Sequence, residues 1–290
     1  MKLTVKFNLI LISIILICLL GTGFFTHFIL HRNAKNEVLK HASLILDMAH
    51  AVRGYTVEEV RPIIQNKMIH KFHPQSVPAY AASKSFDRLS DKHPKYSYKE
   101  AALNPTNPKN LAADWEIDII NSFANDASRS QIIDMRNTAN GPSLFISQPI
   151  RLSNPDCLTC HSEPSKAPKA MLAKYGKTNG FGWKMNDVVA AQIVTVPMSI
   201  PTQVANQIFI IIMAFILAIF AFLIIVINLM LKSIVIKPMN KIAVMAGKVS
   251  MGQMDTPELN FKSKDEITVL ASSFNRMRRS LQKAIKMLED

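Results

Sequence analysis

Two long apolar runs divide the chain of 290 residues into three parts. Residues 7–30 and residues 208–231 contain no Asp, Glu, Lys or Arg. A helix of roughly 24 residues, rising ~1.5 Å per residue, can span the ~30 Å core of a bilayer. We therefore predict two transmembrane helices, preceded by a short segment at residues 1–6. A cleaved signal peptide is the alternative for the first run, but the run exceeds the usual signal core and no clear A-x-A site precedes Arg32.

Helical spacing is the first pattern in residues 31–207, the part between the spans. Apolar positions recur at steps of three and four residues over 34–52, which predicts a helix with one apolar face. A new helix is expected to start at Thr56, because Glu59 three residues later would complete a capping box.

Irregular chain and strands are expected next. Prolines interrupt residues 72–108, so a helix is predicted there only in short pieces such as 79–89. Helical spacing returns at 115–123.

Two strand pairs follow in the sequence. Residues 131–136 and 144–152 flank an Asn-Gly pair at 140–141, which favours a tight hairpin turn. Residues 181–185 and 188–198 predict a second pair across a short turn. Helices first and an antiparallel sheet afterwards predict an α+β domain between the spans.

The part after the second span, residues 232–290, carries two apolar stripes with heptad spacing, joined by a linker. Their members are Ile242, Met245 and Val249 in the first stripe and Ile267, Leu270, Phe274, Met277, Leu281, Ala284 and Leu288 in the second. Stripes of this kind bury side chains such as Met245, Phe274, Met277 and Leu281 only if two chains pair, so we expect a homodimer. A plain juxtamembrane coiled coil is the simpler interpretation.

One pentapeptide, Cys157-Leu158-Thr159-Cys160-His161, carries specific chemistry. In a C-x-x-C-H run the two sulfurs reach the two vinyl groups of one haem, and the histidine presents a ring nitrogen to the iron. We therefore predict haem c, one per chain, with thioethers at Cys157 and Cys160 and with His161 as proximal iron ligand. A redox dithiol, a disulfide or half of a zinc site are the alternatives. No second C-x-x-C completes a zinc site, and the remaining cysteine, Cys18, lies in the first apolar run.

Charge indicates the orientation and the partners. Lys2 and Lys6 precede the first span and lysines such as Lys232 follow the second, so the positive-inside rule places both ends in the cytoplasm. Attachment of haem c resembles an exported, periplasmic process in bacteria, which agrees with residues 31–207 outside the inner membrane. The net charge of +13 is spread over all three parts. We assign it to surfaces near anionic lipid and predict no nucleic-acid partner.

Ordered sequence blocks carry a family resemblance. They are Glu100–Pro108, Asp114–Glu116, Cys157–His161, Ala167-Pro168, Tyr175-Gly176, Gly180–Trp183 and Val194–Met198. Together they resemble the Tll0287-like haem domain, also called DUF3365, which implies a PAS-like fold with one c-type haem held by Cys157, Cys160 and His161. The tail is similar to a HAMP domain, a parallel four-helix bundle made by a dimer, with Pro238 at its entry and Asp265-Glu266 at its second helix. Thr268 departs from the glycine that family often has.

The sixth iron ligand stays open. His50 and Met48 lie near the end of the first helix, which a PAS-like fold could place across the haem face, and Met171 lies close to the motif, so we expect one of these three. The other donors of the outer domain are His41, His70, His73, His93, Met68, Met135, Met185 and Met198. A vacant or water-ligated site is a further alternative. A thiolate is excluded, because the outer domain has only the two attachment cysteines.

These features predict a dimeric membrane sensor and not an enzyme. It would detect redox state, a small gas or another ligand at the haem and pass the signal through the spans to the HAMP bundle. The outer domain shows no nucleophile and base set, and the chain stops at Asp290 after the bundle, so a separate kinase or chemoreceptor is the expected partner. The alternative is a membrane-anchored monohaem electron carrier.

Overall fold

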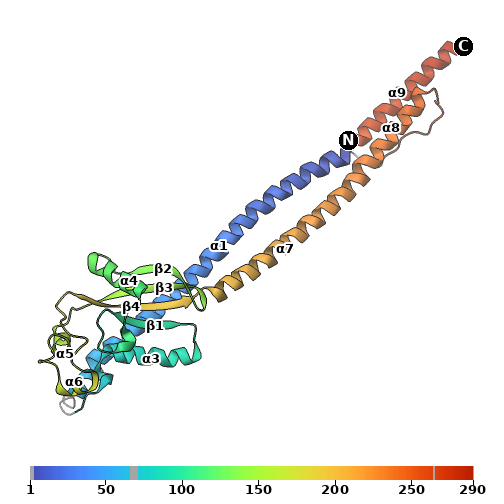
Figure 1. Cartoon of the computed structure of the whole chain (residues 1–290). Coiled ribbons are helices and arrows are strands. Elements are labelled where there is room, and N and C mark those ends of the chain that lie inside the picture. Colours follow the sequence, from blue (N-terminus) through green and yellow to red (C-terminus); the bar gives the residue numbers. More distant parts are fainter. Residues whose placement is uncertain (1–2, 66–70, 264, 290) are drawn as a thin grey trace. The chain divides into compact units, whose positions relative to one another are not determined.

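The structure, a computed structural model, describes residues 3–65, 71–263 and 265–289 (Figure 1). The chain divides into two compact units. One unit consists of residues 26–209, and the other combines residues 1–25 with residues 210–290.

Two long helices, α1 (Leu3–Tyr55) and α7 (Ser199–Met230), contain the apolar runs. Both are long and apolar enough to cross a membrane by length and composition, which agrees with the two predicted spans. Their side chains are exposed, as lipid-facing side chains are: Phe24 is 77% accessible and Ile211 is 68% accessible. Asn8 of α1 and Asn228 of α7 exchange amide hydrogen bonds of 2.9 and 3.0 Å, so these two amides partner each other.

A four-stranded antiparallel sheet organises the unit of residues 26–209, in the spatial order β1-β4-β3-β2. The strands are β1 (Ser97–Ala102), β2 (Ile132–Thr138), β3 (Gly141–Arg151) and β4 (Val188–Pro197). The β2–β3 hairpin confirms the predicted turn. Thr138 pairs with Gly141, whose φ of +88° is one that glycine adopts without strain. A single residue, Met198, separates the end of the inner strand β4 from the start of α7.

Helices cover both faces of this sheet, because side chains alternate along each strand. On one face, Val38, Ala42 and Leu46 of α1 pack against Leu144, Ile146, Val194 and Val196. On the other face, Ile119, Ile120 and Phe123 of α4 (Asp114–Asn125) pack against Phe145, Ala191 and Ile193. The mixed helix and sheet domain predicted from the sequence is therefore observed, and α1 belongs to its core.

Short helices occupy the connections. The helices predicted at 79–89 and 115–123 are confirmed as α3 (Pro78–Lys92) and α4. The others are the 3-10 turns η3 (Pro74–Ser76), η4 (Pro108–Asn110) and η5 (Pro155–Cys157), followed by α5 (Leu158–His161) and α6 (Lys169–Tyr175).

Three expectations about local structure are wrong. Residues 181–185 form no strand, because their backbone bonds to His161 and Ser162 and β4 pairs instead with β1 and β3. Strand β1 lies inside the stretch expected to be irregular, because its six residues pair with the antiparallel strand β4.

The third correction concerns Thr56, which begins no new helix. The chain stays helical through the π-helical turn η1 (Thr56–Val60) into α2 (Arg61–Gln65). The Thr56 hydroxyl donates to the carbonyl of Val52 at 2.7 Å, so it bonds backward within the helix and does not cap a new one.

The tail continues from α7 through a second π-helical turn, η6 (Leu231–Ile236), into α8 (Lys237–Ser250). A connector leads to α9 (Glu266–Glu289), which starts where the sequence predicts. Asp265 accepts from the backbone N–H of Thr268 at 3.0 Å, as an N-cap does. The side-chain amide of Asn275 bonds to both backbone groups of Leu259, at 3.1 and 2.8 Å, and thereby fixes the connector on α9.

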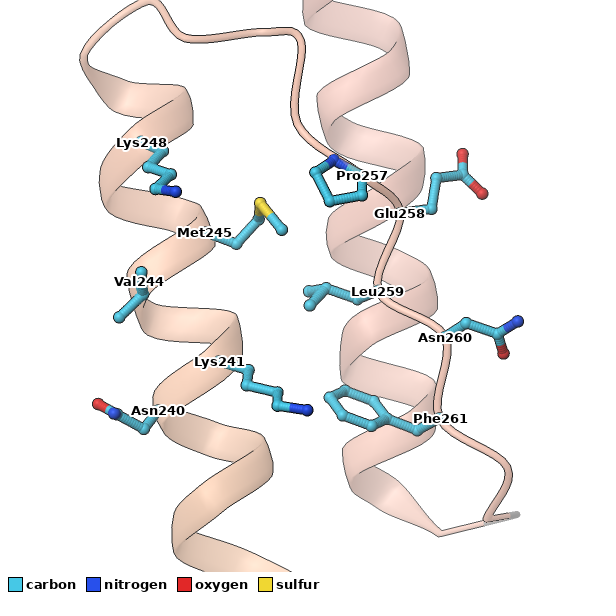
Figure 2. A pocket seen from close by; sticks show the side chains of 10 residues that line it. All are labelled: Asn240, Lys241, Val244, Met245, Lys248, Pro257, Glu258, Leu259, Asn260 and Phe261. Atoms are coloured by element: carbon cyan, nitrogen blue, oxygen red, sulfur yellow. The ribbon is translucent and has the colours of Figure 1, made fainter.

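A groove runs between α8 and the connector at residues 257–261. Figure 2 shows Leu259 and Phe261 pointing toward α8, with Glu258 and Asn260 pointing away. Phe274 is only 8% exposed within a single chain, so the expectation that its burial needs a second chain is wrong. Met277 and Leu281 remain 56% and 42% exposed, and these are the side chains that a partner would cover.

Candidate functional site

The cysteine pair lies in one tight helical turn after β3. Asn154 opens this turn, because its side chain accepts from the backbone N–H of Asp156 at 2.9 Å. Positions three residues apart on such a turn share a side, so the sulfurs of Cys157 and Cys160 are neighbours. Both cysteines are half-buried and unlinked. The segment therefore presents two thiols together, directly before His161.

Two contacts hold the ring of His161. Its Nδ1 lies 2.7 Å from the carbonyl oxygen of Gly180, and since a carbonyl only accepts, Nδ1 carries the proton. Its face stacks on Trp183, with ring centroids 3.9 Å apart and planes 9° from parallel. This arrangement leaves the lone pair on Nε2, which is the form of imidazole that binds a metal.

The protonation of the site agrees with this geometry. Burial lowers the pKa of His161. The hydrogen bond to Gly180 acts to raise this pKa, and the positive charge of nearby Arg61 lowers it further. The imidazole is therefore neutral at pH 7. Burial raises the pKa of Cys157 and that of Cys160, with Arg61 opposing in both cases. Arg61 thus supplies positive charge close to all three residues of the motif.

Gly180 is positioned by the loop that follows β1. Its N–H donates to the side chain of Asn104 at 3.1 Å, and its φ is +82°. A Cβ at this position would collide with the hydroxyl of Thr106, so only glycine fits. Backbone bonds from Gly182 to Ser162, at 2.8 Å, and from Trp183 to His161, at 3.2 Å, clamp the same segment to the motif.

Sequence reasoning missed these supporting roles. Asn104, Gly180 and Trp183 all lie in blocks that carry the family resemblance, yet nothing in their spacing indicates that they converge on His161. A glycine-rich stretch beginning 19 residues after the histidine was the available signal.

A buried polar network lies on the sheet face covered by α1. Arg53 Nη1 is 2.7 and 2.6 Å from the two carboxylate oxygens of Glu100 on β1. The Tyr98 hydroxyl donates to Glu100 at 2.6 Å and accepts from Gln192 of β4 at 2.9 Å. His50 Nε2 lies 2.7 Å from the carbonyl oxygen of the Gln192 side chain, which closes the chain of contacts back onto α1.

Burial and charge tune this network. Burial and the neighbouring Glu100 carboxylate raise the pKa of Tyr98 far above its usual value, so this tyrosine stays protonated. For Arg53, burial lowers the pKa, but the Glu100 carboxylate outweighs this and the net shift is upward. Arg53 also lies near enough to Cys157 to oppose the rise in its pKa. The network therefore reaches the edge of the cysteine motif.

The three candidate distal ligands differ in their surroundings. His50 is engaged with Gln192. Met48 is 51% exposed on α1, and Met171 is 3% exposed in α6. Two other donors named from the sequence, Met68 and His70, lie outside the described residues.

A competing metal site finds no support in the described parts of the chain. Within residues 3–65, 71–263 and 265–289, no group of three or more His, Cys, Asp and Glu side chains could hold a metal ion. Zinc at Cys157 and Cys160 would therefore lack a described ligand set beyond His161. The motif offers two adjacent sulfurs and one neutral, oriented imidazole.

Comparison with known proteins gives two family matches. Residues 31–197 match the Tll0287-like family, described as Tll0287, and residues 230–283 match the HAMP domain. Among solved structures, the chain is similar to the cyanobacterial haem protein Tll0287, with 17% identity and a TM-score of 0.41, over 56% of this chain and 95% of that one. No curated protein sequence matches the chain at a significant level.

Proposed function

The chain belongs to the Tll0287-like family, and on this basis we propose that it is a membrane-bound c-type haem sensor in signal transduction. The observation that carries the proposal is the state of His161, whose Nε2 lone pair is left available beside two unlinked sulfurs. The HAMP match supports signalling, because HAMP domains belong to dimeric membrane receptors.

The residues of this chain would hold one haem c. Cys157 and Cys160 would form the thioethers, and His161 would ligate the iron through Nε2. Arg61, whose charge lies close to all three residues, would add positive charge beside the bound haem. The bound haem would supply an iron centre that changes oxidation state or takes up a small ligand.

For the sixth ligand we propose His50, Met48 or Met171. Methionine ligation should raise the reduction potential and give a weak near-infrared band in the ferric form, whereas bis-histidine ligation should lack the band. His50→Ala and Met171→Ala, compared in ferric and ferrous spectra, separate the choices. Unchanged spectra in these two and in Met48→Ala would leave a vacant site or another donor.

We propose the following division of the chain. Residues 7–30 and 208–231 would span a bacterial inner membrane, residues 31–207 would form a PAS-like domain in the periplasm, and residues 232–290 would form the cytoplasmic HAMP bundle of a homodimer. The two apolar helices and the HAMP match support this division.

The buried network offers a route for the signal. It ties α1, through His50 and Arg53, to β1 and β4, and β4 leads into α7. A change of charge or ligation near Cys157 would alter the packing of α1 against β4, and both elements continue into the proposed spans. The HAMP bundle would then pass the change to a signalling partner such as a kinase or a chemoreceptor.

The test is to separate a sensor from an electron carrier. Spectra of the purified chain, oxidised, reduced and with CO or NO, would show whether the iron takes up a ligand. Deleting residues 242–290 should abolish a downstream response while leaving haem spectra and reduction kinetics intact. Retention of the full cellular phenotype after this deletion would favour the electron carrier and contradict the sensor.

A further inference from the structure

Helix α1 has an exposed apolar stripe on the face turned away from its own domain. Leu44, Met48, Ala51 and Tyr55 form it, at steps of four, three and four residues. Leu44 is 59%, Met48 51% and Tyr55 63% exposed, and Ala51 is also exposed. These steps are the a and d positions of a heptad, the spacing of a helix that pairs with another helix.

The stripe cannot be buried by the domain itself. Val38, Ala42 and Leu46 of the same helix are almost fully buried against the sheet. At 100° per residue, this core face and the stripe lie on nearly opposite sides of α1. Rotating the helix to cover the stripe would expose the core, so the stripe needs a second surface to cover it.

Lipid does not account for the stripe. Leu44 lies 14 residues beyond the apolar run that ends at Leu30, or ~20 Å along an uninterrupted helix at ~1.5 Å per residue. The headgroup layer adds only about 5–8 Å on each side of the hydrocarbon core. The stripe therefore lies in water unless a protein surface covers it.

We infer that the partner is α1 of a second copy of this chain, paired in parallel along Leu44 to Tyr55. This inference rests on the proposed dimeric receptor, because HAMP pairing holds two copies in one membrane with the same orientation. In a parallel two-fold pair each stripe residue faces its own counterpart, so an apolar stripe complements itself. Tethering through the membrane also raises the effective concentration of the second α1, so a short seam suffices.

The seam has a defined length. Toward the membrane its next positions are His41 and Glu37, which contact each other within one helix at 3.4 Å and are both exposed. At its other end, Tyr55 is followed by the buried Thr56 and the π-helical turn. The apolar contact is therefore confined to about three turns of α1. The seam also places Met48 between the two copies, which leaves His50 and Met171 as donors for the haem.

Disulfide cross-linking of the full-length chain in membranes tests this seam. In a Cys18→Ser background, single cysteines at Leu44 and Ala51 should give several-fold more disulfide-linked dimer than controls at Lys35 and Ser43. Lys35 lies on the face opposite the stripe, and Ser43 is rotated by ~100° from Leu44. The background chain, which keeps Cys157 and Cys160, should give no dimer band.

A cysteine at Leu281 of α9 reports the HAMP dimer independently. Cross-linking at Leu281 without an excess at Leu44 and Ala51 over the controls would overturn the seam and leave the receptor dimer standing. Cross-linking at Leu44 and Ala51 without Leu281 would support the seam and count against the HAMP dimer. No cross-linking at any position, or adducts with a protein of another mass, would overturn the seam.

A charge substitution keeps the test independent of cysteine chemistry. Leu44→Glu should abolish cross-linking through Ala51→Cys, whereas Lys35→Glu should not change it. Because both positions are exposed, neither change should disturb folding, and thermal unfolding of the two variants should match. Equal cross-linking in both variants would overturn the seam.

Discussion

The indole of Trp183 lies parallel to the imidazole of His161, with 3.9 Å between ring centroids. Together with the Gly180 carbonyl on Nδ1, it fixes the plane of the ring that we propose to bind iron. Stacking of this kind contributes about 0.5–1.5 kcal/mol beyond burial. Here the stacking energy helps to hold the His161 ring in one orientation.

Replacing Trp183 by Leu should therefore change the ligation of the iron and leave the covalent attachment of haem intact. We expect covalent haem to be retained, while the ferric spectrum and the reduction potential shift because the imidazole plane is no longer fixed. Trp115→Leu is the matched control, since Trp115 packs edge-on against Phe145 with centroids 5.4 Å apart in the sheet core. That variant should lose stability with unshifted spectra. Identical spectra for wild type and Trp183→Leu would contradict the positioning role.

Alanine substitutions at two glycines with the same backbone conformation distinguish the effect of backbone strain from that of a steric collision. Gly180 and Gly182 both have φ +82°, so alanine at either should cost roughly 1 kcal/mol of stability from backbone strain. At Gly180 the new Cβ also meets Thr106, whereas at Gly182 the space is open. Gly180→Ala should therefore destabilise the chain more than Gly182→Ala does and should also alter the ferric spectrum. Equal melting temperatures in the two variants would show that the collision is relieved elsewhere.

The Tyr98 hydroxyl should make stability fall at alkaline pH. The folded state raises its pKa, so its stabilising effect is complete below the unfolded value of about 10 and is lost as pH rises toward the folded value. Tyr98→Phe should cost about 1–3 kcal/mol at pH 7, because Glu100 and Gln192 each lose a partner.

Denaturant unfolding in detergent, followed by circular dichroism, measures this difference. The gap between wild type and Tyr98→Phe should narrow as pH rises above about 10. Phe86→Leu, whose ring packs 4.6 Å from that of Tyr98, should be destabilised by a similar amount at every pH. A gap for Tyr98→Phe that stays constant to high pH would contradict the buried protonated hydroxyl.

The proposed orientation predicts which side a protease reaches. Residues 91–95, at the end of α3 and in the connection to β1, are exposed and include Lys92 and Lys95. Trypsin added to intact spheroplasts should cut there and leave the tail beyond Lys232 protected until detergent is added. Lys92→Gln with Lys95→Gln should remove that early cleavage. Digestion of the tail in intact spheroplasts, with residues 91–95 spared, would reverse the orientation.

The elements predicted well from the sequence are those whose signal is local. The 34–52 helix repeats its apolar residues at helical steps, the Asn-Gly turn needs a positive φ at Gly141, and Asp265 caps α9. Each of these depends on neighbours within a few residues, so the pattern and the structure agree.

Two of the three errors in local structure arise where distant segments decide, and the third, at Thr56, arises from a competing hydrogen bond to Val52. Residues 181–185 have strand propensity, but Trp183 and Gly182 bond to His161 and Ser162 instead. Strand β1 is short and flanked by prolines, and it forms because β4 offers it an antiparallel edge. The same holds for the site. Cys157, Cys160 and His161 are close in sequence and could be predicted, whereas Asn104 and Gly180 are 76 residues apart and meet only in the fold.

Covalent attachment at Cys157 and Cys160 is the central claim, and acid-acetone extraction tests it most directly. Haem should stay with the wild-type chain after extraction. In the double variant Cys157→Ser with Cys160→Ser, haem should extract freely, whereas Cys18→Ser should behave as wild type. Haem that leaves the wild-type chain on extraction, or a purified chain that carries zinc and no haem, would contradict the account.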